Sequence, residues 1–122
     1  MRELMNRLLG SLDKARPRYG YGRGRRPLWD ERNRDAERIR RALRRAGLKE
    51  FGEDGGGFVV ENGEDGGPFS VAAALDPGLD GVNVRTVMDD YTRALTAQGW
   101  RVGPDTGPDP QEQILEVWIT PR

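Results

Sequence analysis

Neither cysteine nor histidine occurs in this sequence of 122 residues. Without cysteine the chain has no disulfide and no thiolate nucleophile, which excludes thiol redox chemistry and a cysteine-stapled secreted scaffold. Without histidine it lacks the commonest general base and the usual zinc ligand. Serine occurs only at positions 11 and 70, and neither stands in a nucleophile-elbow motif. We therefore expect a protein that is not an enzyme and that uses no metal and no cofactor.

Long apolar runs are missing as well. No stretch of about 18 apolar residues could span a membrane, and charges interrupt the first segment, MRELMNRLLGSLDKA, where a secretory signal needs an apolar core. The predicted location is the cytoplasm, or a phage or other bacterial assembly, and we expect no membrane contact. Lysine occurs only at positions 14 and 49, and the strong preference for arginine is typical of a GC-rich bacterial or phage gene.

Charge is unevenly distributed although the net charge is zero. Residues 1–49 contain 16 Lys/Arg and 6 Asp/Glu, a balance of +10, whereas residues 50–122 contain 4 Lys/Arg and 14 Asp/Glu, a balance of −10. Such a split indicates an anionic partner for the first half, or attraction between the two halves within a chain or between chains.

The chain divides into a basic N-terminal part, residues 1–29, and a single predicted domain, residues 30–122. Apolar residues at helical spacing predict a short amphipathic helix over residues 1–12, which must pack on this protein, on a partner or on a membrane surface, the membrane being the least favoured of the three. Its proposed contact residues are Leu4, Met5, Leu8, Leu9 and Leu12. Pro17 and Pro27 then bound an arginine- and glycine-rich arm without apolar periodicity, which we expect to be extended.

Two longer helices are predicted within the domain. Asp30 is expected to cap the first and Gly47 to end it, with an apolar stripe of Ala36, Ile39, Leu43 and Ala46. Asn83 is expected to cap the second and Gly99 to end it, with an apolar stripe of Val84, Val87, Met88, Tyr91 and Leu95.

Extended runs account for most of the remaining chain. The runs LKEF, FVVE and FSVAAAL are joined by two GEDGG turns and predict a three-stranded antiparallel meander, while WRV and ILEVWIT predict a final hairpin. The GEDGG segments lack the alternating acidic pattern of a calcium loop, so we expect turns and not a metal site.

The predicted fold class is α+β: a two-layer sandwich of a mainly antiparallel sheet, about four or five strands wide, with two helices on one face. Alternation along the last strand places Ile114 and Trp118 on the other face, beside the small residues Ala72 and Ala74. We consider Ile114 and Trp118 a candidate hydrophobic interface.

The arm and the first long helix carry the strongest functional signal. The candidate residues for binding a partner or phosphate are Arg16, Arg18, Tyr19, Tyr21, Arg23, Arg25, Arg26, Arg41, Arg44 and Arg45. Arginine neutralises phosphates, and tyrosine rings stack on unpaired bases, but no recognised nucleic-acid-binding motif accompanies them. A solvated linker is a further interpretation of the arm.

These patterns favour a non-enzymatic interaction or assembly protein, of the kind found among bacterial or phage structural components, whose basic arm docks on an acidic protein surface. If that surface belongs to the next copy of the chain, head-to-tail contacts generate a ring or a filament. The alternative is a nucleic-acid-binding protein that contacts phosphates through the arm and the first long helix.

Overall fold

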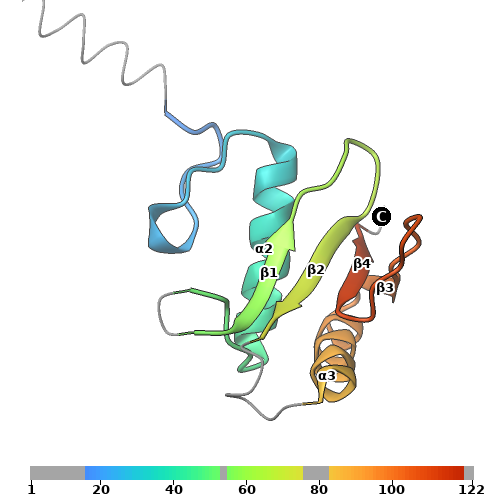
Figure 1. Cartoon of the computed structure of the whole chain (residues 1–122). Helices are drawn as coiled ribbons and strands as arrows, with labels where there is room; N and C mark the ends of the chain where they lie inside the picture. Colours follow the sequence, from blue (N-terminus) through green and yellow to red (C-terminus); the bar gives the residue numbers. More distant parts are fainter. Residues whose placement is uncertain (1–15, 53–54, 76–82, 120–122) are drawn as a thin grey trace, which may run out of the picture.

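A computed structural model describes residues 16–52, 55–75 and 83–119 of the chain (Figure 1). Its elements, in chain order, are η1 (Arg23–Arg25), α2 (Glu31–Arg45), β1 (Gly57–Glu61), β2 (Phe69–Ala74), α3 (Val84–Ala97), β3 (Arg101–Pro104) and β4 (Ile114–Trp118). The amphipathic helix predicted over residues 1–12, with Leu4, Met5, Leu8, Leu9 and Leu12, lies outside the described residues.

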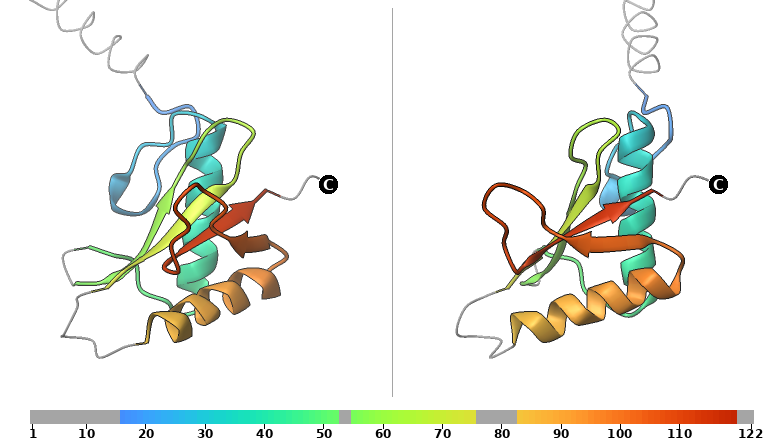
Figure 2. Two further views of the ribbon diagram at one scale, coloured as in Figure 1. Left: turned by 45° about the vertical axis from the view of Figure 1, so that its right-hand side comes forward. Right: turned by 90° about the vertical axis from the view of Figure 1, so that its right-hand side faces the viewer.

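The four strands form one antiparallel sheet in the order β1-β2-β4-β3. In the centre of the sheet, Val71 of β2 pairs with Val60 of β1 on one side and with Leu115 of β4 on the other. Both helices lie on one face of this sheet and meet near the C-terminal end of α2 (Figures 1 and 2). The predicted α+β sandwich is confirmed.

The core lies between the helices and one face of the sheet, because alternate strand residues point to that face. Its largest fully buried apolar side chains come from α2, α3 and three of the strands, namely Ile39, Leu43, Leu95, Phe58, Phe69, Val71 and Val117. The ring of Phe58 meets Tyr91 edge-on, with the ring centres 6.3 Å apart, and this contact joins β1 to α3.

Local sequence signals define both ends of each helix. The side chains of Asp30 and Asn83 each accept a backbone hydrogen bond of 2.8 Å at the start of α2 and α3, as predicted. Gly47 and Gly99 follow the helix ends with φ of 84° and 91°, a conformation that glycine adopts without strain. Among the helices of the described ranges, none combines the length and the apolar character needed to cross a membrane.

One residue of the predicted apolar stripe of α2 is misplaced. Ala46 is exposed because it is the C-cap residue, beyond the last turn that packs on the core, and Ala42 is buried near the end of α3 instead. The stripe of α3 is as predicted, with Met88, Tyr91 and Leu95 buried.

The predicted three-stranded meander is wrong at its first strand. Residues 48–51 run parallel to β1 and make a single bridge, in which the backbone N–H of Phe58 donates to Lys49 and that of Phe51 donates to Phe58. This direction is incompatible with the tight antiparallel hairpin expected for the first GEDGG segment. The second GEDGG segment does connect an antiparallel pair, β1 and β2, and the final hairpin of β3 and β4 is also present.

The arm is not extended over residues 19–28. Backbone hydrogen bonds between Tyr19 and Leu28, Leu28 and Gly20, and Gly22 and Arg26 close it into a hairpin-like loop with η1 near its tip. Glycine at positions 20 and 24 provides the positive φ angles of the turns, 79° and 68°. The glycines interrupt any apolar pattern in this segment. The same glycines allow the backbone to fold back on itself.

Candidate functional site

Five of the seven arginines of α2 lie on two neighbouring faces of the helix. Glu37, Arg40 and Arg44 recur at the i, i+3, i+7 spacing of one stripe, and this stripe contacts the loop 19–28 and the segment that follows α2. A second stripe at the same spacing consists of Arg38, Arg41 and Arg45, which are exposed beside the end of α3. We call this second stripe the arginine face.

A buried ion-pair network occupies the first stripe. The Glu37 side chain is only 2% exposed, and its carboxylate accepts hydrogen bonds from Arg44 at 2.8 Å and Arg26 at 2.9 Å. Two further donors reach it at 3.3 Å, the Arg40 guanidinium and the backbone N–H of Arg23. The network therefore fastens the loop 19–28 to α2.

A second carboxylate extends this network beyond the helix. Glu50 accepts from Arg26 at 2.7 Å and from Arg44 at 3.0 Å, so it bridges the same two guanidinium groups that bind Glu37. Arg40 also donates to the carbonyl oxygen of Val60 at 3.2 Å and thereby covers part of the outer edge of β1. These contacts tie the loop, the helix and the sheet together.

The network sets the protonation of its buried carboxylate. Burial alone raises the pKa of Glu37, but hydrogen bonds from Arg44, the backbone of Arg23 and Arg26 outweigh burial and lower it below its ordinary value. Burial and the neighbouring charge of Arg26 lower the pKa of Arg40. Two predicted binding residues, Arg26 and Arg44, are therefore already ion-paired inside the protein.

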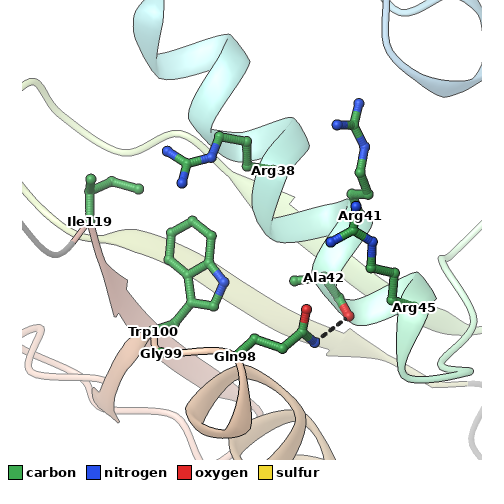
Figure 3. A pocket seen from close by; sticks show the side chains of 8 residues that line it. All are labelled: Arg38, Arg41, Ala42, Arg45, Gln98, Gly99, Trp100 and Ile119. Carbon is green, nitrogen blue, oxygen red and sulfur yellow. Dashed lines mark hydrogen bonds between the residues drawn. The ribbon is translucent and has the colours of Figure 1, made fainter.

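The arginine face borders an open hollow of about 560 Å³ between α2 and the end of α3 (Figure 3). The hollow is lined by Arg38, Arg41, Ala42, Arg45, Gln98, Gly99, Trp100 and Ile119, none of which is acidic. Gln98 donates to the carbonyl oxygen of Ala42 at 2.8 Å and fixes the end of α3 against α2. Trp100 and Gln98 thus stand opposite the three arginines.

The three arginines of the arginine face differ in the ion pairs that they form. Arg38 contacts Asp35 at 3.4 Å, and its guanidinium lies 5.3 Å from the centre of the Trp100 ring. Arg41 and Arg45 form no ion pair with any residue in the described part of the chain. Because guanidinium groups bind carboxylates and phosphates through paired hydrogen bonds, these two are the arginines of α2 best placed to hold an external anion.

The remaining arm residues do not join this hollow. Arg16, Arg18, Arg23 and Arg25 are exposed on or beside the loop 19–28. The two tyrosine rings are partly covered by arginines of the same chain, with Arg34 5.0 Å and Arg18 5.5 Å from Tyr19, and Arg25 5.8 Å from Tyr21. The structure therefore separates the predicted binding residues into the loop surface, the buried network and the arginine face.

The candidate hydrophobic interface lies on the sheet face away from the helices. Val117 is fully buried in the core, while Ile114 and Trp118 point to the opposite face and are half-buried. The guanidinium of Arg101, which is paired with Trp118 across β3 and β4, lies 4.8 Å from the centre of its ring. This contact covers part of the indole and reduces the apolar area that Trp118 offers to a partner.

Sequence reasoning missed Glu37, Glu50, Arg38 and Trp100 as contributors to these sites. The regular spacing of Arg38, Arg41 and Arg45 is present in the sequence and could have indicated one exposed basic stripe. Trp100 gave no such signal, because its place beside α2 depends on how the end of α3 packs against α2.

Comparison with known protein families, with curated proteins and with solved structures found no match for this chain. Within residues 16–52, 55–75 and 83–119, no three acidic side chains gather closely enough to hold a metal ion.

Proposed function

We propose that this protein is a non-enzymatic interaction or assembly protein, of the bacterial or phage structural kind, that docks on an acidic protein surface. The observation that carries the proposal is the pair Arg41 and Arg45, which are exposed without an acidic partner among the described residues, beside a hollow that no described carboxylate lines. The absence of histidine and cysteine from the sequence supports a role without catalysis.

The docking surface proposed here is centred on the arginine face of α2, and the exposed arginines of the arm, Arg18, Arg23 and Arg25, add positive charge to the same protein. Arg26 and Arg44 neutralise Glu37 and Glu50, so their charges are largely used within the fold. The arginine face keeps its charge available, and complementary charge across an interface raises the rate of association and selects the partner. Binding through exposed arginines is screened by salt, so we expect affinity to fall as ionic strength rises.

The proposal is tested with a fluorescently labelled glutamate-rich peptide and an uncharged peptide of equal length. Fluorescence anisotropy on the full chain should detect the acidic peptide only, and R41Q/R45Q should weaken its binding at least tenfold. The matched control is R85Q/R93Q, which removes the same charge from exposed positions of α3 and should leave binding unchanged. Equal losses in both variants would show that net charge, and not the arginine face, determines binding.

A single-stranded nucleic acid is the second candidate partner. The observation in its favour is the position of Trp100 beside Arg38, since an aromatic ring next to arginines is the arrangement on which unpaired bases stack. A labelled oligonucleotide in the same assay separates the two proposals. If it binds more tightly than the acidic peptide and R41Q/R45Q abolishes its binding, the nucleic-acid function replaces the protein-docking function.

A further inference from the structure

The acidic counterpart of the arginine face lies at the opposite end of α2. Three carboxylates, Glu61, Glu64 and Asp65, are exposed at the end of β1 and in the turn between β1 and β2, and we call this group the acidic turn. None of them forms an ion pair with a described residue. Three unpaired negative charges therefore face solvent, as do the two unpaired positive charges of the arginine face, Arg41 and Arg45.

The position of the acidic turn is fixed by the first turn of α2. Arg32 donates to the backbone carbonyl oxygen of Gly67 at 3.0 Å and to that of Asn62, and its guanidinium lies 3.8 Å from the centre of the Phe69 ring. The connection between β1 and β2 therefore lies beside the start of α2 (Figure 1). The acidic turn is held at a defined place on the surface.

The two charged surfaces of one molecule form no ion pair with each other among the described residues. Arg41 and Arg45 follow Arg32 by nine and thirteen residues of continuous α-helix, which corresponds to about 14 Å and about 20 Å along the helix at 1.5 Å per residue. The arginine face is at the end of α2 beside α3, and the acidic turn is at its start (Figures 1 and 3). Because they do not pair within the described part of one molecule, each surface is available to a second molecule.

From this arrangement we infer that the acidic surface recognised by the arginine face is the acidic turn of a second copy of this chain. The inference rests on the proposed function and identifies its partner. Because the contact joins two different surfaces, each copy keeps one of them free after the first contact, and association continues head to tail. The net charge of zero agrees with copies that neutralise one another.

Sedimentation velocity of the full chain at low salt tests the inference. The wild-type protein should sediment faster as its concentration rises, and this association should disappear at high salt. R41Q/R45Q disables the arginine face, and E64Q/D65N disables the acidic turn. Each variant alone should remain monomeric at concentrations at which the wild-type protein associates.

An equimolar mixture of the two variants tests directly whether the contact joins the arginine face of one molecule to the acidic turn of another. One intact arginine face and one intact acidic turn remain in the mixture, on different molecules, so dimers should form and nothing larger. The control R85Q/R93Q should associate like the wild-type protein. A wild-type protein that stays monomeric at low salt, or a variant that associates as strongly as the wild-type protein, would overturn the inference.

The acidic-peptide assay distinguishes failure of this inference from failure of the proposed function. If the wild-type protein is monomeric but R41Q/R45Q still weakens peptide binding selectively, the acidic partner is another protein and only the self-docking inference falls. If neither assay responds to R41Q/R45Q, both proposals fall.

Discussion

Glu37 is a charged residue of α2 that is as buried as a core residue, and its contribution to stability depends on its arginine partners. Replacing it by glutamine removes the carboxylate that Arg26, Arg40 and Arg44 share and leaves Glu50 as the one carboxylate beside Arg26 and Arg44 among the described residues. Breaking a buried ion pair by removing one partner costs about 3–5 kcal/mol, so E37Q should lower the free energy of unfolding by an amount of this order. Urea denaturation followed by circular dichroism measures it. E61Q, which changes an exposed glutamate, should cost less than about 0.5 kcal/mol.

The lowered pKa of Glu37 also makes stability depend on pH. A carboxyl group whose pKa is lower in the folded state stabilises the protein above its unfolded value, and this contribution is lost as pH falls through the folded value. The loss should therefore begin as pH falls below the ordinary glutamate value of 4.5. Urea denaturation at about pH 7, 4 and 3 measures it. An equally steep loss of unfolding free energy in E37Q over this range would contradict the assignment to Glu37.

Single residues were predictable from the sequence where the local backbone alone determines their role. Asp30 and Asn83 cap their helices because the cap involves atoms only two or three residues away. Glu37 was not predictable as a buried residue, because its partner Arg26 comes from a segment before α2 and Glu50, which shares Arg26 and Arg44 with it, comes from a segment after α2. Helical periodicity treats a glutamate between arginines as a solvated position, and only the tertiary structure shows otherwise.

At the scale of elements, the unexpected parallel bridge beside β1 depends on one glycine. A Cβ atom on Gly57 would lie 2.7 Å from the backbone nitrogen of Phe51, and backbone cannot move aside as a flexible side chain does. G57A should therefore cost about 2 kcal/mol of unfolding free energy, typical of overpacking. In G103A, a matched change in β3, the new methyl group meets nothing within 4 Å and should leave stability unchanged or slightly raised. Thermal or urea unfolding of both variants compares them directly.

Elements with a clear apolar periodicity or a clear turn motif could be predicted from the sequence. Elements held mainly by contacts between residues far apart in the sequence could not. Both long helices and the two antiparallel hairpins follow from apolar spacing and glycine turns. Residues 48–51 have strand-like composition, yet the exit from α2 leads them past β1 in the parallel direction for a single bridge. The loop 19–28 shows no apolar periodicity, and its conformation depends on backbone turns and on the ion pair of Arg26 with α2.

At the scale of the whole molecule, the arginines of α2 have two different roles, one structural and one in docking, although the sequence shows only a single basic half. The buried network joins the loop, the helix and the sheet, whereas Arg41 and Arg45 remain exposed to solvent. Sequence alone gives the excess of positive charge but not this division, because the division depends on where Glu37 and Glu50 lie. The two sets should differ in their response to salt, since buried pairs are screened much less than exposed charges.

Raising sodium chloride from about 0.05 M to about 1 M should therefore separate binding from stability. Binding of the acidic peptide should fall at least tenfold, because it depends on exposed charge. The difference in unfolding free energy between the wild-type protein and E37Q should change by less than about 1 kcal/mol over the same range, because the network is buried. The general effect of salt on folding is the same in both proteins, so it is removed when the two unfolding free energies are subtracted. If it shrinks in parallel with binding, the network is as solvated as the arginine face, and the proposed division of α2 into a structural and a docking surface is wrong.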